Sequence, residues 1–175
     1  MNKLEIITIP AQNLREKSRP VECITSELKD LVNAMIDVLH SKPGLGLAAP
    51  QVGYNIRLVI IESKETRDEN DNILYEKIPL TVLFNPEITH FSKEKIEMDE
   101  GCFSVPNMYG PVVRPKKIKA IATSLDGKQI KINAKGLLAR VIQHEIDHID
   151  GVLFIDRVTD PSLIRRIEPD TEIQI

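Results

Sequence analysis

The fold of this chain is decided by the stretch Lys135-Gly-Leu-Leu-Ala-Arg-Val-Ile-Gln-His-Glu-Ile-Asp-His-Ile149. Its apolar residues cover more of a helical surface than one narrow stripe, and Gly151 follows as a stop signal. A helix that is apolar on most of its sides has to be wrapped by other elements. The sequence therefore predicts a central, buried helix over about 135–149.

Two histidines and a glutamate lie in this buried helix, and unpaired buried polar groups are costly. His144 and His148 are four residues apart, so their Cβ atoms lie on one face about 5–6 Å apart and both rings can reach one metal ion. Glu145 lies about 100° round the helix from His144 and about 60° from His148. That position suits a general base acting on metal-bound water. The alternative is a pair of histidines with ordinary hydrogen bonds in the core.

The rest of the chain predicts strands and one further helix around this centre. A helix begins near Thr25 or Ser26 and ends at Pro43 and Gly44. Strands are expected at 57–61, 81–84, 117–123 and 129–132, an exposed hairpin or loop at 62–77, and a short helix at 160–167. The predicted fold class is α+β: antiparallel β-strands packed around a central metal-binding helix, in a single domain over residues 1–175.

Composition limits the classes of function. The 175 residues carry a formal charge of only −3, which gives no reason to expect a nucleic-acid-binding protein. The basic clusters Arg114/Lys116/Lys117/Lys119 and Arg165/Arg166 are interpreted as solvated faces. No membrane span or signal peptide is expected. Two cysteines make a disulfide framework improbable, so the cytoplasm is the expected location.

Two histidines leave a catalytic metal site short of a third protein ligand. Downstream of Gly151 the chain has no histidine, and its two glutamates there, Glu168 and Glu172, lie close to the C-terminus. Upstream, Cys102 lies in Glu100-Gly-Cys-Phe-Ser104, which we expect to be a polar, glycine-containing loop where the backbone can approach an ion. Cys23 is expected to be an ordinary buried residue that behaves as a small hydrophobe.

Three segments together resemble the peptide deformylase family. They are Gly44-Leu-Gly-Leu-Ala-Ala-Pro-Gln51, Glu100-Gly-Cys-Phe-Ser104 and His144-Glu-Ile-Asp-His-Ile-Asp-Gly151. The second segment has Phe103 where leucine is more usual, and the likeness runs from about residue 4 to 158. The resemblance implies a metal-dependent hydrolase that removes the N-formyl group from the N-terminal formyl-methionine of newly synthesised polypeptides.

The resemblance also implies a role for each matching residue. The metal ligands would be Cys102, His144 and His148. Metal-bound hydroxide would attack the formyl carbon, while Glu145 acts as general base and then as general acid. The Gln51 amide and the Phe103 backbone N–H would form the oxyanion hole.

One thiolate and two imidazoles suit zinc. The resemblance instead implies one Fe²⁺ per chain, with Zn²⁺ or Ni²⁺ able to substitute. It implies formyl-methionyl nascent peptides as substrates, and it makes the ribosome near its exit tunnel a candidate partner. No membrane partner and no sequence-specific nucleic acid are expected.

A pocket for the methionine side chain is expected beside the metal. Its candidate residues are Gly44, Leu45, Gly46, Met98, Leu137, Arg140 and Val141. The two glycines would let the substrate backbone run close to the loop. The Arg140 stem would pack against the pocket while its guanidinium reaches the rim. Glu100, Asp147 and Arg114 are candidates for supporting the ligands from behind, with an ordinary structural salt bridge as the alternative.

Two other functions remain open at this point. The first is a metallopeptidase of the general His-Glu-x-x-His kind, which the cysteine and the missing downstream ligand disfavour. The second is a non-catalytic, deformylase-like binding protein. Glu145 and Gln51 disfavour it, because a purely structural metal would need neither.

Overall fold

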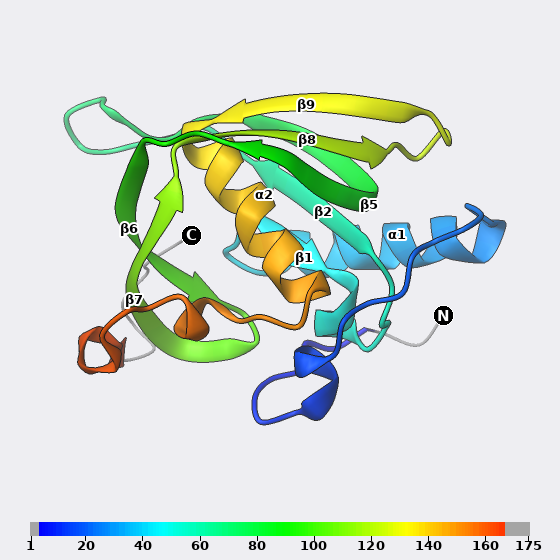
Figure 1. The fold of residues 1–175 in the computed structure, drawn as a ribbon, viewed down its shortest axis with the longest axis horizontal. Helices are drawn as coiled ribbons and strands as arrows, with labels where there is room; N and C mark the ends of the chain where they lie inside the picture. The colour runs from blue at the N-terminus through cyan, green and yellow to red at the C-terminus, as the bar shows by residue number, and fades with distance from the viewer. Residues whose placement is uncertain (1–3, 167–175) are drawn as a thin grey trace.

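The computed structural model describes residues 4–166 of the chain, and an antiparallel five-stranded sheet forms the upper layer in Figure 1. The strand order is β1-β2-β5-β8-β9. The bounds are β1 Gly46–Ala48, β2 Leu58–Ser63, β5 Ile78–Phe91, β8 Lys117–Thr123 and β9 Gln129–Lys135. A turn that contains Asp126-Gly127 joins β8 and β9, whose register pairs Thr123 with Gln129.

A long hairpin curves away from this sheet along one side of the molecule (Figure 1). It consists of β6 Lys95–Cys102 and β7 Val105–Pro115, and the short strand β10 Arg165–Arg166 pairs with the other edge of β7. A second, exposed hairpin is formed by β3 Thr66–Arg67 and β4 Ile73–Tyr75. This second hairpin confirms the exposed hairpin or loop predicted for residues 62–77.

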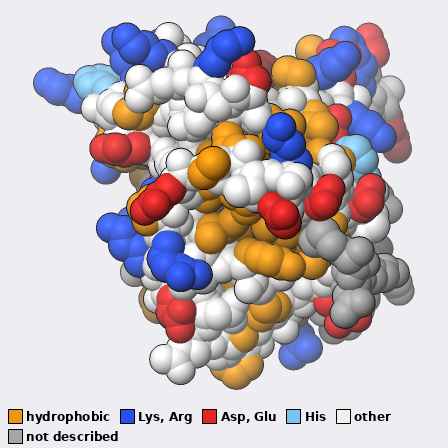
Figure 2. Space-filling view, turned by 90° about the vertical axis from the view of Figure 1, so that its right-hand side faces the viewer, with side chains coloured by type: hydrophobic (Ala, Val, Ile, Leu, Met, Phe, Trp, Pro, Cys, Tyr) orange, Lys and Arg blue, Asp and Glu red, His pale blue; other side chains and the backbone are white. Residues whose placement is uncertain are grey.

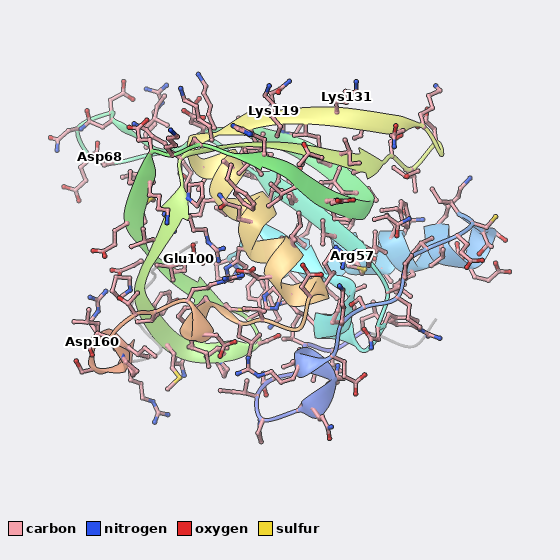
Figure 3. All side chains as sticks on the ribbon, viewed as in Figure 1. Arg57, Asp68, Glu100, Lys119, Lys131 and Asp160 are labelled. Atoms are coloured by element: carbon pink, nitrogen blue, oxygen red, sulfur yellow. The ribbon has the colours of Figure 1, made fainter. Side chains whose placement is uncertain are left out.

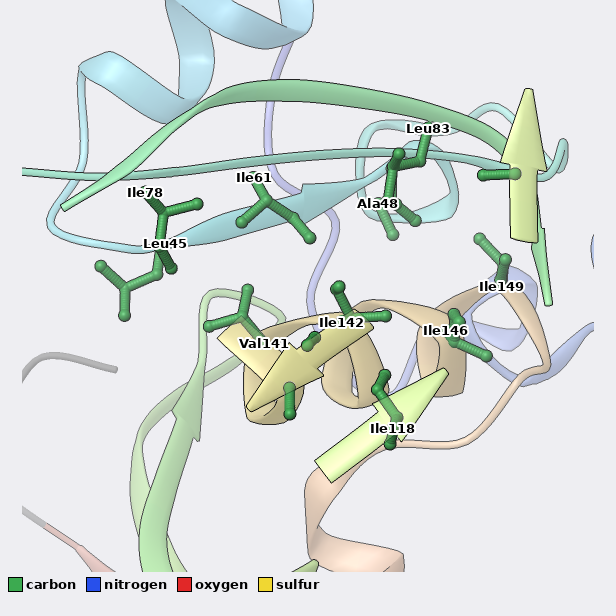
Figure 4. Packing of buried hydrophobic residues seen from close by; sticks show 14 residues of the cluster. Leu45, Ala48, Ile61, Ile78, Leu83, Ile118, Val141, Ile142, Ile146 and Ile149 are labelled. Carbon is green, nitrogen blue, oxygen red and sulfur yellow. The ribbon is translucent and has the colours of Figure 1, made fainter. Parts of the chain in front are cut away.

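Helix α2, Gly136–Ile149, lies between the sheet and the long hairpin (Figure 1). Every residue from Ala139 to Ile149 is buried, which confirms the predicted central helix. Figure 4 shows the apolar residues of α2 facing those of the sheet. The labelled residues are Leu45, Ala48, Ile61, Ile78, Leu83, Ile118, Val141, Ile142, Ile146 and Ile149. Each large aliphatic side chain buried in this way contributes roughly 1.5–3 kcal/mol, so the core fixes the orientation of the helix.

Helix α1, Ser26–His40, covers the opposite face of β1 and β2. Thr25 caps the helix by accepting a hydrogen bond from the Leu28 backbone N–H. Strand β2 is therefore buried on both faces: Val59 and Ile61 pack toward α2, while Leu58 and Ile60 pack toward α1. Figure 2, which looks onto the side that carries α1, shows hydrophobic side chains gathered in the middle of that face with acidic side chains around them.

Short 3-10 turns connect the larger elements. They are η1 Gln12–Arg15, η2 Ala49–Val52, η3 Phe154–Asp156 and η4 Pro161–Leu163. The short helix predicted at 160–167 is wrong in extent, because a single 3-10 turn there gives way to β10, and Ile167 lies outside the described residues. Within residues 4–166, no helix is long and apolar enough to cross a membrane.

Three further expectations are corrected by the structure. Cys102 is the last residue of β6 rather than part of a loop, because its strand pairs with β7 as far as Val105. Cys23 is exposed rather than buried. Arg114 does not belong to a solvated face, since its side chain is buried between carboxylates.

Candidate metal centre

The β6–β7 hairpin and helix α2 bring three ligand-type side chains together. One ligand atom each from Cys102, His144 and His148 lies within 4.8 Å of the other two. The Cys102 Sγ and the His148 Nε2 are 3.1 Å apart. A zinc-sized ion with ligands at about 2.0–2.3 Å holds them roughly 3.5 Å apart in a tetrahedral arrangement. The spacing of the three groups therefore fits a single ion.

The electrostatics of the two histidines also fit a cation at this point. Burial lowers the pKa of His144, but the Cys102 sulfur and the Glu100 carboxylate raise it more, so the net shift is well upward. Burial and the neighbouring His144 charge hold the pKa of His148 well below its usual value. The group thus favours one positive charge between the sulfur and the rings. A divalent ion would supply that charge in place of a proton.

Glu145 lies beside the ligands with one carboxylate oxygen free. Its Oε2 is buried and has no hydrogen-bond partner among the described residues. Burial raises the pKa of Glu145 to about 7. A buried carboxyl group with an open oxygen is suited to accept and release a proton.

The two glycines of the first motif leave room for the side chains of Glu145 and Phe103. A Cβ added at Gly46 would lie 2.4 Å from the Glu145 Oε1, and one at Gly44 would lie 2.1 Å from the Phe103 ring. Only Gly46 lines the cavity described below. Gly44 makes room for the Phe103 ring, and its expected contact with the substrate backbone stays a prediction.

Gln51 is held so that its amide nitrogen faces Cys102 and Ser104. The Ala48 backbone N–H donates to its Oε1 at 2.8 Å, which leaves the Nε2 as the free end. That Nε2 lies 3.4 Å from the Cys102 Sγ and 3.3 Å from the Ser104 Oγ. The Ser104 backbone N–H also donates to the Cys102 Sγ at 3.4 Å. Two N–H groups aimed at one sulfur suit a thiolate ligand.

Phe103 and Ser104 form the two-residue turn of the hairpin, because Cys102 pairs with Val105 across it. Phe103 lines the cavity. Ser104 was not singled out by the sequence analysis, although it closes the motif that contains the cysteine. Its contacts with the sulfur and with Gln51 are properties of the turn, and the sequence alone does not reveal them.

A buried ionic network lies behind His144, on the side away from the cavity's candidate ligand atoms. The Glu100 Oε2 lies 2.9 Å from the His144 Nδ1, and Arg114 donates two hydrogen bonds to the same carboxylate at 2.6 and 2.8 Å. Burial alone would raise the pKa of Glu100, but the hydrogen bonds from Arg114 and His144 lower it by more. The net shift is downward, so this carboxyl stays ionised. Asp147 accepts from Arg114 at 2.8 Å and from Arg157 at 2.6 Å. A His144 that donates through its Nδ1 presents its Nε2 to an ion.

A cavity of about 1020 Å³ opens onto these groups. Of the predicted pocket residues, Leu45, Gly46 and Val141 line it, and Cys102, His144, Glu145 and Gln51 form its polar end. Much of the remaining apolar lining was not predicted; it comes from Leu4, Ile6, Val38, Val105 and Met108. These residues belong to the N-terminal segment, α1 and β7, which only the tertiary fold brings to the site.

Four predicted pocket residues do not line the cavity. Besides Gly44, Met98 is 41% exposed on β6, and Leu137 packs against the main core. Arg140 is only 2% exposed, so the expectation that its guanidinium reaches the rim is wrong. Its charge is instead neutralised inside the protein by Glu100.

The family described as polypeptide deformylase matches residues 3–163 of this chain. Peptide deformylase from Hydrogenovibrio crunogenus is 42% identical over 168 residues, which cover 96% of this chain and 93% of that protein. Peptide deformylase 1B from Arabidopsis thaliana is 40% identical over 91% of this chain. The chain spans a little over half the length of this and a tomato relative, 56% and 54%.

Solved structures give the same result. A peptide deformylase from Synechococcus elongatus, crystallised with actinonin, has a TM-score of 0.81 and 35% identity, with 91% of this chain and 81% of that one covered. A plant peptide deformylase 1B also has a TM-score of 0.81, with 39% identity over 93% of this chain and 84% of that one. The antiparallel α+β architecture predicted from the sequence is confirmed. By its sequence match over residues 3–163 and by its fold, this chain belongs to the polypeptide deformylase family.

Proposed function

We propose that this protein removes the N-formyl group from the N-terminal formyl-methionine of newly synthesised polypeptides. The observation that carries the proposal is the open, buried oxygen of Glu145 beside Cys102, His144 and His148, at a cavity that both apolar and polar residues line. Membership of the family supports the same reaction.

The proposed metal ligands are Cys102, His144 and His148. When bound, a divalent ion lowers the pKa of a water ligand from 15.7 to about 7 and polarises the substrate carbonyl. Glu145 accepts the proton of the attacking water as the water oxygen bonds to the formyl carbon. It then delivers that proton to the amine nitrogen as the carbon–nitrogen bond breaks. The products are formate and a peptide with a free amino terminus.

Gln51 and the Phe103 backbone N–H are the proposed donors to the oxyanion. Gln51 suits this role because its oxygen is already bound by Ala48, so its NH₂ end is the one that faces the site. A fixed donor needs no reorganisation as negative charge develops, and one such donor is worth about 3 kcal/mol.

The substrate peptide is proposed to lie along β1. This strand is an edge of the five-stranded sheet, and Gly46 at its start lines the cavity. An extended peptide can add its backbone hydrogen bonds to such an edge. The methionine side chain would then contact Leu45 and Val141.

We propose Fe²⁺ as the physiological ion, with Zn²⁺ or Ni²⁺ able to replace it, because the family resemblance implies it. The ligand set by itself suits zinc equally well. Nascent formyl-methionyl chains near the ribosomal exit tunnel are the proposed substrates in the cell. The proposed location is the cytoplasm, in line with two cysteines that are both free.

A panel of matched peptides tests the function. Protein purified without oxygen and loaded with Fe²⁺ should release formate from formyl-Met-Ala-Ser. It should leave acetyl-Met-Ala-Ser and the internal peptide bonds intact. No formate release with Fe²⁺, Ni²⁺ or Zn²⁺ would refute the enzyme and favour a binding protein. Cleavage of internal bonds would indicate a metallopeptidase instead.

A further inference from the structure

Arg140 is the side chain that ties the metal helix to both strands of the cysteine-bearing hairpin. It is among the largest fully buried side chains of the described chain. Its Nη1 donates to the Glu100 carboxylate and, at 3.1 Å, to the Val112 carbonyl of β7. Its Nη2 donates to the Ile96 carbonyl of β6 at 2.8 Å. One guanidinium therefore bonds to three residues on two strands.

The contacts of Arg140 also bear on His144, because the two side chains bind the same carboxylate of Glu100. Arg140 precedes His144 by one turn, so both side chains lie on the same face of α2. Arg140 binds the Glu100 Oε1, while His144 contacts the Oε2 of the same carboxylate. Figure 3 shows Glu100 between the hairpin and α2. Glu100 precedes Cys102 by two residues on β6, so the bond from Arg140 to Glu100 holds the strand that carries the Cys102 sulfur.

The metal site needs its sulfur and its two rings at a fixed separation, although they come from different elements. The β6–β7 hairpin belongs to a different sheet from the one that packs over α2 in the main core. Arg114 also holds Glu100, but it lies on β7 within the hairpin itself. Arg140 binds the same Glu100 carboxylate from helix α2 and so links the hairpin to the helix.

We propose that Arg140 is a positioning residue, which sets the distance between Cys102 and the two histidines by clamping Glu100, Ile96 and Val112 to α2. The inference rests on the proposed metal site. It does not depend on which substrate the enzyme hydrolyses. Partners that orient metal ligands from behind typically change metal affinity by about 10–100-fold when they are removed.

The test compares Arg140→Met with wild type after loading with Co²⁺, which serves as a spectroscopic probe. The Met side chain keeps an apolar stem and removes the guanidinium. We expect Co²⁺ to dissociate to a chelator at least about tenfold faster, with an altered thiolate-to-cobalt charge-transfer band. Arg57→Met is the matched control, because Arg57 bonds to Asp150 and to the Pro86 carbonyl, outside the network around Glu100. It should keep the wild-type rate and spectrum.

A second variant guards against loss of folding. Arg140→Lys keeps the charge, but one ammonium cannot span acceptors that two separate guanidinium nitrogens reach. Its dissociation rate should lie between those of wild type and Arg140→Met, with folding checked by circular dichroism. Wild-type rates and spectra in the folded Arg140 variants would overturn the inference, even if their Tm fell. Wild-type protein that binds no Co²⁺ would refute the proposed metal site instead.

Discussion

Gly46→Ala is predicted to impair catalysis while leaving the fold and the metal in place. An added Cβ would lie 2.4 Å from the Glu145 Oε1, whereas ordinary contact begins at 3.4 Å. The difference, 3.4 − 2.4, means that the carboxylate must move by about 1.0 Å. A misplacement of about 1 Å at a catalytic group can cost on the order of 10²-fold in rate. We therefore expect kcat for formyl-Met-Ala-Ser to fall about a hundredfold.

The assay compares formate release, metal content and thermal unfolding for Gly46→Ala and Gly127→Ala. A Cβ at Gly127 would meet nothing within 4 Å, although its φ of +82° makes alanine strained there. Gly127→Ala should therefore lose about 1 kcal/mol of stability and keep its kcat. Metal content should be unchanged in both variants, because Glu145 is not a proposed ligand. A folded Gly46→Ala protein with kcat within twofold of wild type would show that the position of Glu145 is not critical.

Glu145→Ala should keep the metal and lose about 10²–10⁴-fold in kcat, because the proton carrier is removed; loss of the metal from this variant would mean that a ligand was mistaken for a base. Cys102→Ala should sharply weaken zinc retention in dialysis against a chelator, whereas Cys23→Ala, an exposed cysteine, should retain the ion as wild type does. Metal-free protein should lose stability as pH rises. The folded pKa of Glu145 is raised from 4.5 to about 7, so its contribution is fully present below pH 4.5 and lost through pH 7. Denaturant unfolding of the wild type should show a loss of about 3 kcal/mol in the free energy of unfolding over that range. Glu145→Gln should lack this loss, and a loss as large as that of the wild type would contradict the assignment to Glu145.

The sequence predicted the central helix well, and it also predicted that the two histidine rings lie together on one face. Both features depend on local spacing. Eleven consecutive buried residues of α2 leave a strong apolar signal along the chain. The first helix was predicted equally well, because Thr25 caps it and Pro43 follows its end.

The β6–β7 hairpin was missed for a physical reason. Strand β6, Lys95–Cys102, contains four charged residues, and half of its residues are exposed, so it lacks the apolar run that marks a strand. Its stability comes from pairing with β7 and from the buried bonds of Glu100. Neither can be read from spacing. For the same reason the guanidinium of Arg140 was wrongly expected at the pocket rim. The sequence of a helix does not show that a buried carboxylate from another strand, here Glu100, will pair with its arginine.

The cavity lining was the least predictable part of the site. Leu4 and Ile6 reach it from the start of the described chain, and Val38 reaches it from α1. Leu4 and Ile6 precede the first motif by 38 residues or more, and Val38 lies on a separate helix, so only the tertiary structure identifies them. By contrast, the four groups at the polar end lie within the three motifs that the family resemblance singled out.

The central claim is that one ion, held by Cys102, His144 and His148, makes this chain a deformylase. The most direct test is a titration of metal-free protein with Fe²⁺ in the absence of oxygen, with formate release from formyl-Met-Ala-Ser measured at each step. Activity should be absent at the start, rise linearly and reach its plateau at one ion per chain. Full activity in the chelated protein, or none at saturating Fe²⁺, would contradict the claim.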